Sequence, residues 1–433
     1  MPLKTIRNKI KNTALSPAYG VVQNINANAI IATGLKVSIG QSVTIVTKDE
    51  KRLGMVTSLG ADSFTITPFG FVEGMQVGDK VLLNRKSLDI PVGDNLLGRV
   101  VDPFMNPIDN KGAIYLDEYE SVMKAPMDVM KRGLIDEHFS VGIKSIDGLL
   151  TCGKGQKLGI FAGSGVGKST LMGMLVRGSQ AAIKVVALIG ERGREVPEFI
   201  VKNLKNDLTD TVIVVATSDD SALMRKYGAF SAMSVAEYFK RKGHDVLFMM
   251  DSVTRFAMAQ REIGLALGEP PTSKGYPPSS LTLLPQLMER AGKEEGQGSI
   301  TAFFTVLVEG DDLSDPIADQ SRSILDGHIV LSRELTDKGI YPPVNILSSA
   351  SRVMGDVVEQ EHLKNAQKFR QLLALLKENE MLIRIGAYQK GTDLELDTAL
   401  NKKEAMENFL KQSATQSIPF EETIALLKKI IDQ

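Results

Sequence analysis

The chain has 433 residues, of which 43% are hydrophobic and 24% charged, so it can bury a sizeable core, and at roughly 150 residues each about three domains are expected. Its 51 basic and 52 acidic side chains give a net charge of −1, which argues against a protein that coats nucleic acid. A single cysteine, Cys152, excludes an internal disulfide, and the four scattered histidines lack the spacing of a structural zinc site.

The first segment, MPLKTIRNKIKN, carries basic side chains and no acidic one. Leu3, Ile6 and Ile10 are spaced as on one face of a helix, so one interpretation is a short basic amphipathic helix that docks a partner or an anionic surface. The other interpretation is a frayed terminus. This end lacks the apolar core of a signal peptide, and no apolar run in the chain approaches the roughly 20 residues that span a bilayer.

The next segment, from Tyr19 to about Leu83, has the pattern of a small all-β barrel or sandwich. Short β-branched runs such as Val43–Val46 and Ser63–Thr67 alternate with turns rich in Gly, Asn and Asp. The segment has no cluster of acids, histidines or hydroxyls, so we expect it to serve as a scaffold or an oligomer collar.

Beyond a loop-rich stretch with four prolines, apolar strands alternate with helices. Apolar strands that do not alternate with polar residues, separated by helices, indicate a mostly parallel sheet covered on both faces. Strands are expected at Leu158–Phe161, Val185–Ile189, Val212–Ala216, Val246–Met250, Ile300–Val308 and His328–Leu331, and helices at Ser169–Ala182, Val196–Leu204, Ala222–Lys240 and Ser280–Arg290.

After about Ser351 the strands stop and helices are expected. Leu363, Ala366 and Phe369 recur at helical spacing, and a last helix is expected to begin near Ser417. The expected domains are an N-terminal basic segment 1–18, a β-barrel domain 19–90, a central α/β domain 91–350 and a C-terminal α-helical domain 351–433.

The strongest local signal is the run AGSGVGKST, from Ala162 to Thr170. Its glycines let the backbone N–H groups point at phosphate oxygens, Lys168 reaches the β- and γ-phosphates, and the hydroxyl of Ser169 can ligate Mg²⁺. The strict pattern has Gly where this chain has Ala162, but a strand enters the loop and a helix leaves it. The residues expected to bind ATP here are Gly163, Ser164, Gly165, Val166, Gly167, Lys168, Ser169 and Thr170.

Two acidic side chains are expected at the same edge of the sheet. DVLFMMDS places Asp251 at the carboxyl end of a buried strand, where a carboxylate can hold Mg²⁺ through water. ALIGERGREV places Glu191 just after another strand, where a carboxylate can orient an attacking water, with Arg192 and Glu195 beside it. Taken alone, the first stretch also fits a structural strand, and the second also fits a solvated charged turn.

These three elements together resemble the catalytic subunits of the rotary ATPase superfamily, whose core is RecA-like. The resemblance runs from about Tyr19 to the C-terminus. PPVNILSSAS, followed by Arg352, resembles the family pattern P-[SAP]-[LIV]-[DNH]-x-x-x-S-x-S. Within the superfamily the chain most resembles the flagellar protein-export ATPases and their virulence type III secretion relatives. The runs that carry this resemblance are GERGREV, DSVTRFAMAQREIGLALGEPPTSKGYPPSS, EGDDLSDPIADQSRSILDGHIVLSREL and GAYQKGTDLELDTAL.

The resemblance implies a role for each acidic residue of the site. Glu191 would be the catalytic carboxylate, with Arg192 next to the γ-phosphate. Asp251 would be the Walker B acid that holds Mg²⁺ together with Ser169, and Glu195 would lie near the water shell of the metal.

Three further residues acquire roles only through the resemblance. Arg255 would line the active site and Tyr341 would stack on adenine. Arg352 would be an arginine finger presented to the nucleotide of a neighbouring subunit, and a finger supplied in trans is worth roughly a thousandfold or more in rate. If Arg352 serves a neighbour, the assembled ring is the competent enzyme, which fits a homohexamer.

Four alternatives stay open. An ATP synthase catalytic subunit typically has GGAGVGKT and GERTREG, where this chain has AGSGVGKS and GERGREV, and its acidic C-terminal motif is absent here. A virulence-secretion ATPase is harder to separate from a flagellar one. A ring-shaped RNA translocase needs basic grooves with aromatics, which the β region lacks. A non-enzymatic nucleotide-binding collar is disfavoured by Glu191.

The resulting hypothesis is a Mg²⁺-dependent ATPase of flagellar type III export. It would form a six-membered ring at the cytoplasmic base of the export apparatus, peripheral to the inner membrane, and would release or unfold export substrates and chaperones at the export gate. The segment Met1 to Thr13 is the candidate site for a negative regulator. The loop EGDDLSDP, Glu309 to Pro316, faces the central shaft in related rings, which implies a coiled-coil stalk partner. No nucleic-acid partner is expected.

Overall fold

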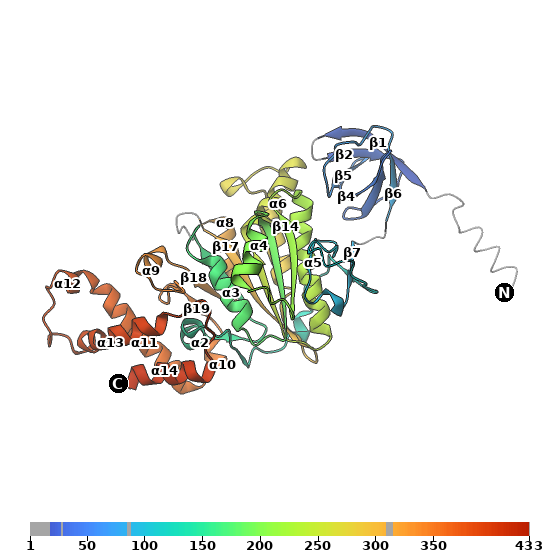
Figure 1. Ribbon diagram of the computed structural model, residues 1–433. Coiled ribbons are helices and arrows are strands. Elements are labelled where there is room, and N and C mark those ends of the chain that lie inside the picture. The colour runs from blue at the N-terminus through green and yellow to red at the C-terminus, as the bar shows by residue number, and fades with distance from the viewer. Residues whose placement is uncertain (1–17, 27–28, 85–87, 309–314, 433) are drawn as a thin grey trace.

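The computed structural model describes residues 18–26, 29–84, 88–308 and 315–432. It has three parts: a small barrel, a central sheet with helices around it, and a group of C-terminal helices at the end opposite the barrel (Figure 1). The predicted fold class, an α/β P-loop core with an N-terminal β-barrel and a C-terminal helical region, is confirmed. The predicted N-terminal helix and residues 309–314 of the EGDDLSDP loop lie outside the described residues. No helix within those ranges combines the length and apolar character that spanning a membrane requires.

The barrel consists of strands that bury alternate side chains. In β3, Val43 and Ile45 are fully buried while Thr44 between them is not, as expected for a strand with one face in a core. Strand β6 pairs with both β1 and β3, so the sheet closes and leaves no free edge. In the barrel order β1-β2-β5-β4-β3-β6, the strands are β1 (Tyr19–Asn26), β2 (Ala29–Thr33), β5 (Phe64–Pro68), β4 (Lys51–Leu59), β3 (Ser42–Val46) and β6 (Lys80–Leu83).

The segment after the barrel reaches the central sheet through short strands. β7 and β9 pair with each other, and β8 joins the edge of the central sheet beside β14 (Thr211–Thr217). The sequence predicted only loop here, because such short runs carry too little periodicity to identify a strand. The elements are β7 (Asp89–Val92), β8 (Val100–Val101), β9 (Glu118–Ser121), β10 (His138–Phe139), α2 (Lys144–Leu149) and β11 (Cys152–Gly153), with short 3₁₀ turns at Asp94–Leu96 and Val129–Lys131.

In the described residues, nine strands form the central sheet, and they include all six strands predicted for this region. The order is β19-β18-β12-β17-β15-β13-β14-β8, parallel except at β19, with β16 antiparallel beside β17. Because these parallel strands run in one direction, the carboxyl ends of β12, β15 and β13 lie at one edge. The remaining bounds are β12 (Lys157–Ala162), β13 (Ile183–Glu191), β15 (Val246–Asp251), β16 (Gly292–Lys293), β17 (Ser299–Leu307), β18 (Gly327–Val330) and β19 (Ala350–Ser351).

Helices cover both faces of this sheet because its strands are apolar on both sides. Along β13, Val185 and Ala187 belong to one core while Val186 and Leu188 belong to the other. Helices α5 to α8 contribute to the first core, and α3 and the C-terminal helices contribute to the second. The bounds are α3 (Lys168–Gly178), α4 (Glu195–Glu198), α5 (Ala222–Arg241), α6 (Val253–Ala266), α7 (Pro278–Met288), α8 (Pro316–Ile324), α9 (Arg333–Asp337) and α10 (Met354–Val357), with a 3₁₀ turn at Ser273–Gly275.

Some helix bounds differ from the prediction. Helix α3 ends at Gly178 and not at Ala182, because the intervening residues turn the chain into β13. The helix predicted from Val196 to Leu204 is divided into α4 and a π-helical turn at Phe199–Asn203. The sequence analysis did not assign α6, whose first turn is capped by the hydroxyl of Ser252.

The C-terminal helices pack on the second face of the sheet. The rings of Phe369 and Phe409 pack at a tilted angle with centroids 5.5 Å apart and belong to the same apolar cluster as Ile160 of β12. The last helix begins at Phe420, slightly later than the predicted start near Ser417. The bounds are α11 (Gln360–Glu378), α12 (Glu380–Arg384), α13 (Leu394–Leu410) and α14 (Phe420–Asp432).

Candidate active site at the carboxyl edge of the sheet

The phosphate loop connects β12 to α3 in the conformation that its glycines allow. Gly165 and Gly167 have φ angles of 76° and 98°, in the left-handed region that favours glycine. No side chain caps the N-terminus of α3, so its first backbone N–H groups remain directed into the loop. Arg333 of α9 donates a hydrogen bond to the carbonyl of Ser164 at 2.9 Å and braces the loop from outside. Sequence reasoning missed Arg333, because no local motif marks it.

Lys168 and Asp251 form the centre of the site. The Lys168 ammonium lies 2.5 Å from Asp251 Oδ1 and 3.6 Å from Glu191 Oε1. Burial lowers the pKa of Lys168, but the charges of the two carboxylates outweigh burial and leave the pKa above its ordinary value. The hydroxyl of Thr305 on β17 donates to Asp251 Oδ1 at 2.6 Å. The sequence does not single out Thr305, because β17 also contains the buried polar residues Ser299 and Thr301.

Glu191 ends β13 beside this pair. Its side chain is 14% exposed, and within the described residues Oε1 is buried without a hydrogen-bond partner. Burial and the nearby charge of Asp251 raise the pKa of Glu191 to about 7, against the opposing charge of Lys168. A buried carboxylate with an unused acceptor and a pKa near neutrality can accept a hydrogen bond, or a proton, from a water.

Arg255 approaches Glu191 from the first turn of α6. Gly190 has a φ of 74°, and a Cβ added to it would lie 2.7 Å from Arg255 Cβ, so glycine is needed for this approach. Within the described part of the chain, Arg255 Nε is buried without a hydrogen-bond partner. The structure therefore places a partly buried guanidinium, with its Nε atom fully buried, beside the strand end that carries Glu191.

Arg192 and Glu195 lie further out than Glu191. The Arg192 side chain is 66% exposed and its closest acidic partner is Glu195, at 3.9 Å. The carboxylate of Glu195, which is 38% exposed, also raises the pKa of Glu191, first through a side-chain hydrogen bond and then through its charge. Both residues are on the same edge of the sheet as the phosphate loop, in or next to α4.

Tyr341 lines a pocket of about 230 Å³ next to the phosphate loop. Its ring lies near Gly167, where an added Cβ would be 3.5 Å from Tyr341 Cε1, and the residue is 42% exposed. The turn after α13, residues 412–414, also lines this pocket, and the sequence analysis did not identify it. The pocket residues are Gly167, Thr170, Leu171, Met174, Tyr341, Pro342, Pro343, Gln412, Ser413 and Ala414.

Arg352 lies away from this cluster. It follows β19, its side chain is exposed, and its guanidinium donates to the carbonyl of Arg322 at 3.3 Å. Within the described residues no hydrogen bond or ion pair joins Arg352 to Lys168, Glu191 or Asp251. The structure thus brings Lys168 and Glu191 together with Asp251, whereas Arg192 and Arg352 have exposed side chains outside this cluster.

Two family models match the chain. Residues 142–351 match the nucleotide-binding domain of the ATP synthase alpha/beta family, and residues 358–429 match the C-terminal domain of T3SS EscN ATPases. The first match contains the phosphate loop and both buried carboxylates. The second begins just after Arg352 and covers most of the C-terminal helices.

The chain is also similar to named proteins over nearly its whole length. It is 66% identical to a flagellum-specific ATP synthase of Helicobacter pylori over 433 residues, which is 100% of both chains. The assembled ATPase EscN from the enteropathogenic E. coli type III secretion system has a TM-score of 0.90 at 47% identity, over 95% of this chain and 100% of that chain. EscN in complex with its central stalk EscO has a TM-score of 0.89 at 46% identity, with the same coverage.

Proposed function

Because this chain belongs to the flagellum-specific and type III secretion ATPases of the ATP synthase alpha/beta family, we propose that it hydrolyses ATP at the carboxyl edge of its central sheet to drive flagellar protein export. The full-length identity of 66% to a flagellum-specific relative supports the flagellar system over the virulence one. The observation that carries the site assignment is the convergence of Lys168, at the start of α3, with Asp251 and Glu191, at the ends of the neighbouring strands β15 and β13.

In this proposal each residue of the chain has a separate task. The phosphate loop binds the triphosphate through backbone N–H groups and Lys168, whose raised pKa keeps it charged. Glu191 orients and polarises the attacking water through its buried Oε1, which accepts no hydrogen bond within the described residues. Arg255 and Arg192 add positive charge near the γ-phosphate, and Tyr341 stacks on the base in the adjoining pocket.

We propose that Mg²⁺ enters the site with ATP. The hydroxyl of Ser169 and the carboxylate of Asp251 are the oxygen donors that Mg²⁺ prefers, and Glu195 is placed to hold a water of its shell. When bound, the ion supplies neutralisation of the charge on the β- and γ-phosphates. Asp251 is already held by Thr305, so its carboxylate is oriented toward the loop.

The exposed position of Arg352 supports a ring as the active form. An arginine that is distant from its own Lys168 can serve the nucleotide of an adjacent copy, and EscN was solved as an assembled ATPase and with a central stalk. We therefore propose a homohexamer that receives a coiled-coil stalk. The remaining proposals concern the other partners: a regulator on the N-terminal segment, export substrates and chaperones at the gate, and peripheral association with the inner membrane on its cytoplasmic side.

Replacing Glu191 with Gln tests the assignment directly. The amide keeps the size of the side chain and loses its charge, so we expect unchanged nucleotide affinity and a loss of turnover of about a hundredfold or more. The measurements are steady-state phosphate release and equilibrium binding of a fluorescent ATP analogue. Glu198→Gln is the matched control, because Glu198 lies in the adjoining α4 with a 56% exposed side chain paired to Lys202. Turnover of Glu191→Gln within a few-fold of the unmodified protein would remove Glu191 from the mechanism.

A further inference from the structure

The position of Arg352 is determined by its backbone more than by its side chain. Within the described residues its guanidinium makes one long hydrogen bond, 3.3 Å, to a backbone carbonyl; its charge also acts on the Asp326 carboxylate, and the side chain is exposed. The backbone is held more firmly: Arg352 N–H donates to the carbonyl of Asp326 at 3.0 Å, and Ser351 ends the short strand β19 at the edge of the sheet. Whatever fixes residues 351 and 352 therefore fixes where the guanidinium is presented.

Gln156 is the side chain that fixes this segment. It is fully buried, directly before β12, and its Oε1 accepts a hydrogen bond from Gly153 N–H at 2.9 Å. Its Nε2 donates both hydrogens, one to the carbonyl of Asp326 at 3.0 Å and one to Ser351 Oγ at 3.1 Å. Gln156 thus contacts Asp326, the residue before β18, and Ser351, the last residue of β19.

The surrounding contacts make this arrangement specific to an amide. The Asp326 carbonyl accepts from Gln156 Nε2 and from Arg352 N–H, so one acceptor joins the two residues. Ser351 Oγ accepts from Gln156 and donates to the carbonyl of Thr151 at 2.8 Å. A buried polar group that loses its partner costs about 1–3 kcal/mol, so a side chain without two donors at this position would shift the segment or leave acceptors unsatisfied.

Gln156 also belongs to the chain's own nucleotide-binding strand. It precedes Lys157, the first residue of β12, and β12 leads directly into the phosphate loop. Through β12, Gln156 is connected along the chain to the phosphate loop of its own subunit. Through its side chain, it is hydrogen-bonded to the segment that carries Arg352, the proposed finger for the nucleotide of a neighbouring subunit. The two connections give two testable roles, one toward each nucleotide.

We propose that Gln156 is a positioning residue for the arginine finger: it holds Ser351 and the Asp326 carbonyl so that Arg352 is presented to the nucleotide of the neighbouring subunit. This inference rests on the proposed function, in which Arg352 acts in trans. Under it, Gln156→Ala lowers ring-dependent ATP turnover by about a hundredfold, the effect expected when a catalytic group is misplaced by roughly an ångström. Affinity for nucleotide in the chain's own site is unchanged.

Two further variants separate positioning from folding. Ser351→Ala removes the hydroxyl that Gln156 contacts without opening a large cavity, and a smaller loss in the same direction is expected. Thr301→Val is the matched control: Thr301 is fully buried on β17, and its hydroxyl accepts from Gly155 N–H at 2.9 Å, next to Gln156. Among the described residues no interaction joins Thr301 to Asp326, Ser351 or Arg352, so this variant should keep its turnover.

Mixed rings distinguish the two roles. Gln156→Ala or Ser351→Ala is mixed, as unassembled chains, with one of two partners. The partner Glu191→Gln has an intact finger but no catalytic carboxylate. The partner Arg352→Ala has an intact carboxylate but no finger. Activity is measured per ring after assembly. If Gln156 positions the finger, mixing Gln156→Ala with Glu191→Gln restores turnover, because Glu191→Gln supplies a finger to the intact site of Gln156→Ala. Mixing Gln156→Ala with Arg352→Ala restores none, because neither chain supplies a working finger. Ser351→Ala should behave in the same way.

The other outcomes overturn the inference or its premise separately. Recovery of Gln156→Ala with Arg352→Ala alone would mean that Gln156 serves its own phosphate loop through β12. If Gln156→Ala and Ser351→Ala regain turnover with neither Glu191→Gln nor Arg352→Ala, the two variants have a folding defect. If both variants are fully active by themselves, Gln156 does not position the finger. If Glu191→Gln and Arg352→Ala fail to restore turnover when mixed with each other, Arg352 does not act in trans. In that case the proposed ring mechanism is wrong, which is a different result from a wrong role for Gln156.

Discussion

Burial changes the chemistry of single residues at the carboxyl edge of the sheet. A glutamate in water would be fully ionised at neutral pH and a weak base, but burial and the charge of Asp251 raise the pKa of Glu191 to about 7. A group with a pKa near the working pH combines a useful fraction of the basic form with useful basicity. The positive charge of Lys168 limits the rise in the pKa of Glu191, so the opposing effects of Asp251 and Lys168 together determine the pH range in which Glu191 is ionised.

The pH dependence of turnover follows from the direction of this shift. Because the folded pKa is raised, Glu191 takes up a proton as pH falls through about 7, and the protonated form cannot polarise water. Turnover should therefore fall about tenfold per pH unit below that value and level off above it. Glu195→Gln should move the acid limb to lower pH, because the charge of Glu195 contributes to the raised pKa. The check is the pH profile of kcat/KM, which reports the pKa of the nucleotide-free protein, and an acid limb near the ordinary glutamate pKa of about 4.3 in the unmodified protein would contradict it.

At the scale of elements, a turn between two C-terminal helices forms part of the wall of the pocket beside the phosphate loop. Gln412, in the turn after α13, donates its backbone N–H to the carbonyl of Tyr341 at 2.7 Å. Its side-chain Oε1 accepts from Lys144 N–H at 2.9 Å, and its Nε2 donates to the carbonyl of Gly142 at 2.7 Å. This one side chain fastens the turn to the start of α2 and to the base pocket. The buried carboxylate of Asp147 in α2 in turn accepts from Gly142 N–H.

Removing the Gln412 side chain should loosen that wall without touching the catalytic carboxylates. We expect Gln412→Ala to raise the KM for ATP about tenfold, since a buried hydrogen bond contributes roughly 1 kcal/mol and an unsatisfied partner costs more, with kcat changed much less. Gln416→Ala is the control, because Gln416 is exposed in the same turn and contacts Gln412 only through its carbonyl. Steady-state kinetics and binding of a fluorescent analogue give the two constants. A large fall in kcat at constant KM would contradict this role.

These elements show what the sequence could predict. The six central strands and the phosphate loop were predictable, because apolar runs and glycine spacing are local patterns. The convergence of Asp251 and Glu191 followed from the geometry of parallel strands. Gln412 could not be found in this way, since its partner Lys144 is 268 positions away. Helix α6 was detectable, because Val253, Phe256 and Ile263 recur at helical spacing behind a serine cap.

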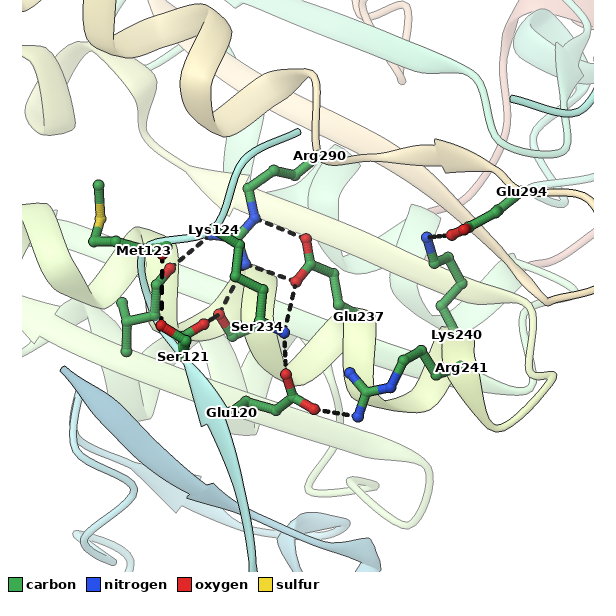
Figure 2. A network of polar contacts seen from close by, with 11 residues as sticks. Glu120, Ser121, Met123, Lys124, Ser234, Glu237, Lys240, Arg241, Arg290 and Glu294 are labelled. Carbon is green, nitrogen blue, oxygen red and sulfur yellow. Dashed lines mark hydrogen bonds and ion pairs between the residues drawn. The ribbon is translucent and has the colours of Figure 1, made fainter. Parts of the chain in front are cut away.

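At the scale of the whole molecule, the C-terminal helices share a core with the sheet, whereas a polar network helps to tie the segment after the barrel to it. Figure 2 shows this network, which joins β9 and the residues after it to α5 and to the end of α7. Arg290 is its centre: the guanidinium donates twice to Glu237, at 2.7 Å each, and to the carbonyl of Val122 at 2.8 Å. Lys124 lies 3.5 Å from the same carboxylate and also pairs with Glu120. Burial would raise the pKa of Glu237, but the hydrogen bonds and charge of Arg290 outweigh it and lower the pKa.

The free energy of unfolding should therefore fall more when Arg290 alone is replaced than when Arg290 and Glu237 are replaced together. Arg290→Met keeps much of the side-chain length but leaves Glu237, with a side chain only 13% exposed, without its main counter-charge, and should cost about 3–5 kcal/mol of unfolding free energy. Arg290→Met with Glu237→Leu should recover much of that loss, because no unpaired charge remains buried. Lys338→Met, which breaks a half-exposed pair with Glu334, should cost less than about 1 kcal/mol.

Urea unfolding followed at several pH values distinguishes this from simple loss of packing. Because the folded pKa of Glu237 is lowered, its pairing with Arg290 contributes stability above the unfolded glutamate pKa, and that contribution is lost as pH falls through the folded value. The difference in unfolding midpoint between the unmodified protein and Arg290→Met should therefore shrink toward acid pH. A difference that stays constant with pH, or a double variant as unstable as the single one, would show that Arg290 acts through its packing against Phe230 and not through its charge.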